Sequence, residues 1–220
     1  MGKFKYLVDI PALIEIFKEK YHIPQEINLR YYPLEGIAFD QEMGEVVIPM
    51  IAFIEGGMIL PMGRITRDYL CNHRLCPHQC APNLFRILGA VDTLNQHLRL
   101  GLTWLDVVHL YEGHKQKRVG FYLKSRSKVV KLISCLPKSN KGMKDDYLIA
   151  SGPWHDGFPC PTQLGEPVGY PRIRFFNIRF KIFVLGFVLL YIIFLGIITV
   201  NPHVVRAKIT LPTRGLKSVT

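Results

Sequence analysis

Three cysteines and two histidines lie within ten residues of one another, in the stretch CNHRLCPHQC at residues 71–80. Structural zinc sites use four thiolate or imidazole ligands, commonly arranged as two tight pairs. Here the cysteines have the spacing Cys-x4-Cys-x3-Cys, and no second tight pair follows along the chain. The spacing therefore favours semi-buried side chains at a corner between two helices, and we expect no metal and no cofactor. The alternative, a zinc site, would draw its ligands from Cys71, His73, Cys76, His78 and Cys80.

A second stretch, HKQKRVGFYLKSRSKVVK at residues 114–131, is strongly basic. It contains seven basic residues and no acidic one. Basic side chains bind phosphates by counterion release, and aromatic rings stack on unpaired bases. The alternative is a solvated β-hairpin whose aromatic rings pack inward, which a charge run more often indicates. A nucleic-acid site in this stretch would use Lys115, Lys117, Arg118, Phe121, Tyr122, Lys124, Arg126 and Lys128.

Three carboxylates, Asp92, Asp106 and Glu112, could be imagined as the acidic trio of a metal-dependent nuclease. Asp106 instead follows Thr103 at the spacing of a capping box, which predicts the start of a helix. The spacing from Asp106 to Glu112 does not align two side chains on one helical face. The sequence also lacks a Gly-x-Ser-x-Gly elbow and a phosphate-binding loop. We therefore predict that the protein is not an enzyme.

The net charge of +11 would by itself suggest a nucleic acid or an anionic membrane as the partner. The excess is uneven, because residues 1–169 hold 20 basic and 17 acidic residues, whereas residues 170–220 hold 8 basic residues and no acidic one. Five cysteines in no regular framework, and no secretory signal at the N-terminus, predict reduced thiols in a cytosolic or nuclear setting.

Helical periodicity is clearest in the first half of the chain. Asp9 and Pro11 open a predicted helix that runs through Lys20. Two further helices, over 61–75 and 83–98, flank a short loop between Pro77 and Pro82, and Met62, Ile65, Tyr69 and Leu70 share one face of the first. A fourth helix is predicted from residue 104 to a stop at Gly113. The apolar run 46–59 is predicted as a helix ending at Gly56 and Gly57, or as two buried pieces.

The later segments predict less regular structure. The runs VGFYL and VVKLI are β-prone and, joined by KSRSK, predict a hairpin. Prolines at 153, 159, 161, 167 and 171 predict a linker. Residues 182–200 carry no charge over 19 positions and have basic flanks, which is typical of a helix that crosses a bilayer. The alternatives are a buried core helix, or a gene-model extension from about residue 170 onward, since Phe, Ile, Leu, Val and Tyr have largely T-rich codons.

The expected fold class is mainly α within α+β: a helical globular domain with a small β-hairpin, a Pro/Gly-rich linker and a C-terminal transmembrane-like helix. The predicted organisation is an N-terminal helical segment (1–29), a globular domain (30–157), a linker (158–179), a transmembrane helix (180–200) and a basic tail (201–220).

Three stretches taken together resemble one family. The first is LPMGRITRDYLCNHRLCPHQCAPNLFRILGAVDTLN, in which Pro77, Gln79, Pro82 and Asn83 carry the resemblance. The second is VGFYL, and the third is LPKSNKGMKDDYLIASGPW at residues 136–154. Their order is similar to that of the plant gypsy-type transposon domain, which is also described as transposase-like and as gag-related. The similarity covers residues 30–157.

The chain also departs from that family. Met143 stands where the family often has Trp, the helix at 83–98 lacks a Trp before Arg86, and the C-terminal region is apolar where family members are polar. The resemblance implies an origin in a mobile element, and it implies no catalytic residue.

These observations predict a retrotransposon-derived, non-catalytic, gag-like structural or interaction protein. Its expected partners are a second copy of itself or other retroelement proteins, and the lipid bilayer through residues 182–200. The alternative is a weak nucleic-acid-binding module that uses the basic stretch at 114–131. The expected location is a membrane, with a single span, if residues 182–200 are an anchor, and otherwise the nucleus or the cytoplasm.

Overall fold

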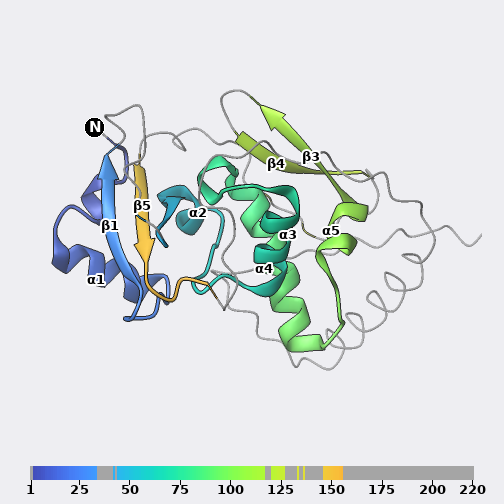
Figure 1. The fold of residues 1–220 in the computed structure, drawn as a ribbon, viewed down its shortest axis with the longest axis horizontal. Helices are drawn as coiled ribbons and strands as arrows, with labels where there is room; N and C mark the ends of the chain where they lie inside the picture. Colours follow the sequence, from blue (N-terminus) through green and yellow to red (C-terminus); the bar gives the residue numbers. More distant parts are fainter. Residues whose placement is uncertain are drawn as a thin grey trace, which may run out of the picture.

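The computed structural model describes residues 2–33, 42, 44–116, 120–126, 133, 136 and 146–155. A three-stranded sheet lies at the left of Figure 1 with helices beside it, and a two-stranded sheet lies at the upper right with helices below it. The elements follow in the order η1 (Lys5–Leu7), α1 (Pro11–Lys20), β1 (Asn28–Pro33), β2 (Val46–Pro49), α2 (Met50–Ile54), α3 (Arg64–His73), η2 (Pro77–Gln79), α4 (Pro82–Leu98), α5 (Trp104–Leu110), β3 (Tyr111–Gln116), β4 (Gly120–Ser125) and β5 (Asp146–Ser151).

The larger sheet is antiparallel and has the strand order β1-β5-β2. The last described strand of the chain, β5, therefore lies in the centre and pairs Asn28 with Ser151 at one end and Pro33 with Asp146 at the other. The strands β2 and β5 are buried on both faces of the sheet. Leu148 and Ala150 face the main core, whereas Ile149 belongs to a second, smaller cluster on the opposite face.

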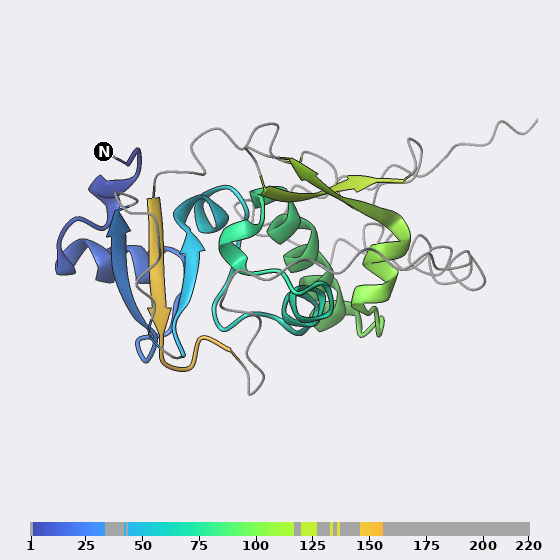
Figure 2. The ribbon, with the colours of Figure 1, turned by 45° about the horizontal axis from the view of Figure 1, so that its top comes forward.

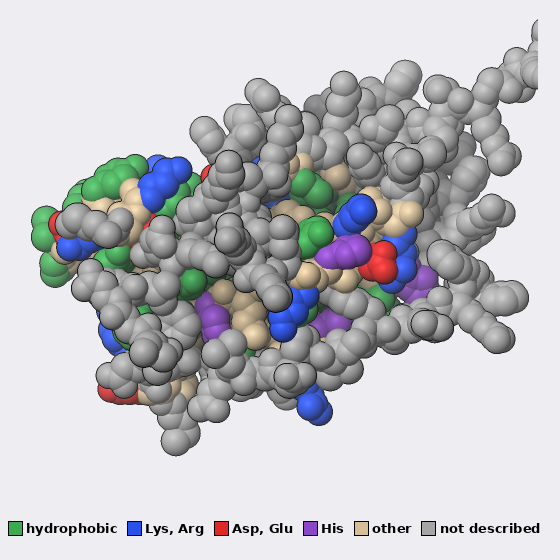
Figure 3. Space-filling model, turned by 90° about the horizontal axis from the view of Figure 1, so that it is seen from above, with side chains coloured by type: hydrophobic (Ala, Val, Ile, Leu, Met, Phe, Trp, Pro, Cys, Tyr) green, Lys and Arg blue, Asp and Glu red, His purple; other side chains and the backbone are tan. Residues whose placement is uncertain are grey.

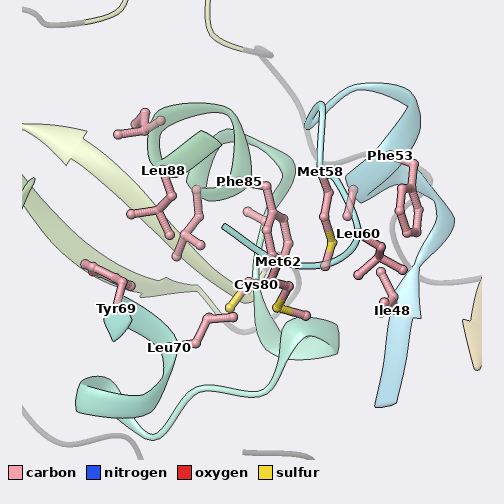
Figure 4. Packing of buried hydrophobic residues seen from close by; sticks show 14 of the residues in the cluster. Ile48, Phe53, Met58, Leu60, Met62, Tyr69, Leu70, Cys80, Phe85 and Leu88 are labelled. Carbon is pink, nitrogen blue, oxygen red and sulfur yellow. The ribbon is translucent and has the colours of Figure 1, made fainter. Parts of the chain in front are cut away.

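The helices α3 and α4 pack against each other, and the β3–β4 hairpin packs against α4 and α5 (Figure 2). One main core cluster joins these helices to the sheet, and it includes residues from Phe4 to Trp154. Figure 4 shows its centre, where Phe85 and Leu88 of α4 lie beside Met62 and Leu70.

The N-terminus of α3 is capped from another helix. The N-cap residue Gly63 has no side chain that could accept a hydrogen bond. The carboxylate of Asp92 in α4 takes this role. Its Oδ1 accepts a hydrogen bond from Ile65 N at 2.8 Å, and its Oδ2 accepts from Thr66 N at 3.2 Å and from Thr66 Oγ1 at 3.0 Å. A Cβ atom at residue 63 would overlap the Asp92 carboxylate, so this close approach requires glycine.

The expected mainly helical class is wrong, because the chain is α+β with a three-stranded and a two-stranded antiparallel sheet in the described residues. The strands β1 and β5 lie more than 100 residues apart in the chain, so no local pattern shows their pairing. None of the described helices is long and apolar enough to cross a membrane. The helix predicted to cross a bilayer, residues 182–200, lies outside the described residues.

For the run 46–59, the alternative of two buried pieces is confirmed, since β2 and α2 lie there. Several other elements differ from expectation. The helix predicted to end at Gly113 ends at Leu110, and Tyr111 begins β3. The described strand that pairs with β4 is therefore β3. Of the VVKLI run, which was predicted to be its partner, only Ile133 lies in the described residues. Asp9 does not cap α1 but forms an ion pair with Lys5 at 3.3 Å.

Candidate functional site

The stretch 71–80 forms the corner between α3 and α4. The helix α3 ends at His73 because Arg74 adopts the left-handed conformation, with φ +50°. A single 3-10 turn, η2, then lies beside β2. Cys76 begins that turn, and its backbone N–H donates to Oε1 of Gln79 at 2.9 Å. The corner is therefore an ordered connection between two helices and the larger sheet.

The thiol of Cys80 lies inside the hydrophobic core. Figure 4 shows it beside Met62 and Leu70. Its Sγ donates to the carbonyl oxygen of Cys76 at 3.4 Å. Cys71 is half-buried on α3, and burial raises the pKa of its thiol, which disfavours the thiolate that metals bind.

The two histidines of the corner are packing elements. The ring of His73 stacks on Tyr69, with centroids 4.2 Å apart, and meets Trp104 edge-on at 5.6 Å. Burial lowers the pKa of His73, so its ring is neutral at pH 7 and Nδ1–H donates to the Tyr69 carbonyl at 2.9 Å. Burial also lowers the pKa of His78 to about 4. In the part of the chain that the structure describes, no three His, Cys, Asp or Glu side chains form a cluster that could hold a metal ion.

The corner also holds the β3–β4 hairpin in place. Cys80 forms a parallel bridge with Phe121, and the backbone N–H of Ala81 donates to the Phe121 carbonyl at 2.7 Å. Next to it, Asn83 Nδ2 donates to the Leu123 carbonyl at 2.8 Å. These bonds occupy the edge of β4 that faces away from β3, so the corner and the hairpin form one unit.

Of the eight residues predicted to bind nucleic acid, the structure describes five. Lys117, Arg118 and Lys128 lie outside the described residues. The five described residues are brought together on β4 and its neighbours: Lys115, Phe121, Tyr122, Lys124 and Arg126.

The two aromatic residues of the hairpin lie on opposite faces. Phe121 is buried against the core, and the ammonium of Lys115 lies 5.5 Å from its ring centroid. Tyr122 is half-buried, packs in part against the main core and stacks on His114, with centroids 5.5 Å apart. A base therefore has more access to Tyr122 than to Phe121.

Charges on the outer face of the hairpin are mixed in sign. Glu112 is the cross-strand neighbour of Lys124, and its Oε2 lies 3.5 Å from His114 Nε2. Arg126 donates from Nε to the Val108 carbonyl at 3.0 Å, which ties it to the end of α5. Figure 3 shows basic, acidic and histidine side chains interspersed on the side of the molecule where β3 and β4 lie. This arrangement is not a uniformly basic groove.

The three carboxylates of the imagined acidic trio have separate positions. Asp92 caps α3, as described above, and burial raises its pKa, partly offset by the hydrogen bonds from Ile65 and Thr66. Asp106 forms the predicted capping box, in which its Oδ2 accepts from the backbone N–H of Thr103 at 2.8 Å. Glu112 lies on β3.

An exposed apolar surface at the N-terminus was not predicted. The exposed fractions are 67% for Tyr6, 54% for Ile10 and 59% for Ile16. Figure 3 shows hydrophobic side chains gathered at the end of the molecule where α1 lies in Figure 1. Helical periodicity could have indicated this exposed surface, because Phe17 of α1 is buried in the core whereas Ile16, one residue earlier, faces away from the core. We call the exposed side chains of residues 3–20 the N-terminal surface.

Comparisons of the chain with protein-family models, with curated proteins and with solved structures return no match.

Proposed function

We propose that this chain is a non-catalytic, gag-like structural protein of retroelement origin, which associates with a second copy of itself through the N-terminal surface. The observation that carries the proposal is the exposure of Tyr6, Ile10 and Ile16 within eleven residues of one another. Exposed apolar side chains that gather in one place on a folded domain mark protein contacts. Aromatic side chains are enriched at the centres of such contacts.

The charge of this surface favours a second copy as the partner. Residues 170–220 hold eight basic residues and no acidic one, so two copies repel each other where these segments approach. Residues 2–21, in contrast, hold four basic and three acidic residues. The N-terminal surface is therefore close to neutral, and two copies meet there with little repulsion.

The positions of the carboxylates support a non-catalytic role. Asp92 and Asp106 each accept hydrogen bonds at the start of a helix. A carboxylate held in this way contributes to the stability of the helix.

The β3–β4 hairpin is the second candidate, as a weak nucleic-acid-binding surface, because Lys115 and Lys124 are exposed there. Glu112 beside Lys124 and the bond from Arg126 to Val108 reduce the charge that a phosphate would meet. Titration of a fluorescent single-stranded oligonucleotide at several salt concentrations tests this role. Binding through this surface weakens as salt rises and is lost in Lys124→Glu, whereas no binding at low salt removes the candidate.

Sedimentation velocity and light scattering on the intact chain test the self-association. A mild non-ionic detergent is included, because it suppresses association through the uncharged run 182–200. We expect a weak, concentration-dependent dimer, since three side chains cover less than the roughly 800 Å² per partner of a standard interface.

The matched variants are Ile16→Asp in the N-terminal surface and Leu105→Asp on α5, where Leu105 is also exposed, at 40%. Ile16→Asp should raise the dissociation constant by about tenfold or more, because a charge is then buried against apolar side chains. Leu105→Asp should leave it unchanged. A wild-type chain that stays monomeric at the highest concentration would contradict the proposal.

A further inference from the structure

The two edges of the β3–β4 hairpin differ, and the bonds of β4 show which way its backbone groups point. The carbonyl of Phe121 accepts from the N–H of Ala81 at 2.7 Å. The side-chain amide of Asn83 bonds both backbone groups of Leu123, at 2.8 and 3.4 Å. Phe121 and Leu123 therefore direct their backbone groups away from β3. Because this direction alternates along a strand, the residue between them, Tyr122, directs its own groups toward β3.

The same alternation defines the outer edge of β3. Tyr122 pairs with His114, so these two residues bond the strands to each other. The residues on either side of His114, which are Gly113 and Lys115, therefore direct their N–H and C=O groups away from β4. None of the described residues bonds these outward groups of Gly113 or Lys115. The outer edge of β3 thus presents a donor and an acceptor at each of two residues.

The side chains at these two positions do not protect the edge. Natural edge strands are often protected by a lysine whose charge repels an incoming strand. The ammonium of Lys115 instead lies 5.5 Å from the ring centroid of Phe121, its cross-strand neighbour on β4. Gly113 has no side chain. An edge with unpaired backbone groups can accept a further strand, whose main chain supplies the hydrogen bonds.

We propose that the outer edge of β3 pairs with β3 of a second copy, antiparallel, about a two-fold axis at His114. In this register Gly113 of each copy pairs with Lys115 of the other, so every outward N–H and C=O group of both residues is bonded. The stem of Lys115 then lies opposite a residue that has no side chain. Glu112 of each copy lies diagonally across from His114 of the other, so that a carboxylate meets an imidazole and not a second carboxylate. This self-complementarity favours a second copy over an unrelated strand.

The neighbouring registers satisfy the edge less well. A register centred on Gly113 pairs Lys115 with Tyr111, whose N–H already donates to the Val107 carbonyl of α5. A register centred on Lys115 places two ammonium groups opposite each other, which is repulsive. The register at His114 avoids both problems.

Disulfide cross-linking of the intact chain tests this pairing. All chains carry Ile16→Asp, so that the separate contact proposed at the N-terminal surface does not bring the copies together. Facing residues of a non-hydrogen-bonded antiparallel pair have Cα atoms close enough for a disulfide, so His114→Cys should form a covalent dimer about fivefold faster, or more, than Lys124→Cys. Lys124 is the matched control, because it is exposed on β4, the other strand of the hairpin. The chain without an added cysteine gives the background from its five native cysteines.

A proline at residue 115 tests the backbone bonds themselves. Lys115→Pro removes an N–H that points away from β4, so the hairpin's own ladder is kept. Added to His114→Cys, it should slow cross-linking by about fivefold or more, because symmetry removes two hydrogen bonds between the copies. Lys115→Ala removes the same side chain but keeps the N–H, and it should leave the rate unchanged. Circular dichroism shows whether each variant is folded.

Two results would overturn the edge pairing. One is a His114→Cys chain that cross-links no faster than Lys124→Cys, which decides the matter even if the proline variant does not fold. The other is an equal rate for folded Lys115→Pro and Lys115→Ala chains. Since Ile16→Asp is present throughout, neither result bears on the association proposed for the N-terminal surface.

Discussion

The side-chain amide of Asn83 pairs with both backbone polar groups of Leu123, as a neighbouring strand would. Its Nδ2 donates to the Leu123 carbonyl at 2.8 Å, and its Oδ1 accepts from the Leu123 N–H at 3.4 Å. Asn83 lies in the first turn of α4, directly after the backbone bond between Ala81 and Phe121. The first residues of a helix thus continue the ladder of β4 and cover its outer edge.

Replacing Asn83 with Leu should destabilise the protein by about 1–3 kcal/mol. The two side chains have similar size, so the main loss is that of two hydrogen bonds to half-buried backbone groups of Leu123. Urea unfolding of the intact chain, followed by circular dichroism, measures the change. Asn72→Leu is the matched control, because the exposed Asn72 amide donates only to the Asp68 carbonyl of its own helix. Equal effects of the two substitutions would show that the contact with Leu123 contributes nothing.

Removal of divalent metal should leave the melting temperature unchanged. Cys80 Sγ lies in the hydrophobic core, and His73 is committed to its stack with Tyr69. A structural zinc ion contributes on the order of 10 kcal/mol or more to folding, so chelation of a real site would be obvious. Thermal melts with and without excess EDTA, together with metal analysis of the purified chain, provide the measurement. One equivalent of zinc and a melting temperature that falls by several degrees with EDTA would contradict this reading of the corner.

Helices were predictable where apolar residues recur at helical spacing or where a cap has a local signature. The helices α1, α3 and α4 were predicted to within a few residues, and the start of α5 followed from Thr103 and Asp106. The end of α5 was not predictable, because Tyr111 continues the helical apolar pattern but is buried as the first residue of a strand. Tertiary packing decides that boundary.

The larger sheet could not be predicted for two physical reasons. Its pairings are distant in sequence, since Asn28 pairs with Ser151. The central strand β5 is also buried on both faces, so it lacks the alternation of apolar and polar residues that marks a half-buried strand.

The candidate sites show the same limit. A stretch of cysteines and histidines identifies possible ligands, but the sequence does not say that Cys80 points into the core. For the hairpin, alternation predicts that Phe121 and Tyr122 face opposite ways, yet only the packing against α4 shows which of them is buried.

Asp92→Asn should remove part of the pH dependence of stability. Burial raises the pKa of the Asp92 carboxyl in the folded protein above its unfolded value of about 3.9. The folded state therefore holds the proton more tightly, and the carboxyl's contribution to the free energy of unfolding falls as pH rises from about 4 through the raised folded pKa. Asparagine cannot ionise, so the variant should gain stability relative to the wild type across that interval.

Urea unfolding of both chains at a series of pH values from acid to neutral measures this difference. Asp106→Asn is the control, because Asp106 caps α5 at an exposed position. If Asp92→Asn instead loses stability relative to the wild type as pH rises, the hydrogen bonds from Ile65 and Thr66 outweigh the effect of burial.

Trp154 should be the most costly aromatic position in the described part of the chain. It is fully buried, and its Nε1–H donates to the Gly44 carbonyl at 2.7 Å, which ties the end of β5 to the turn before β2. Its own carbonyl accepts from Met62 N at 3.2 Å, on the approach to α3. Trp154→Ala should therefore cost about 3–5 kcal/mol, because it creates a cavity and leaves the Gly44 carbonyl without its donor.

Trp154→Phe separates these two effects, since it keeps most of the ring volume and removes the indole N–H. We expect a loss of about 1–3 kcal/mol for Trp154→Phe. Trp104→Phe is the control, because the half-buried Trp104 meets His73 only edge-on. Circular dichroism is the appropriate probe in urea, since each substitution alters the tryptophan fluorescence. If Trp154→Phe costs no more than Trp104→Phe, the bond to Gly44 does not hold β5 to the turn before β2.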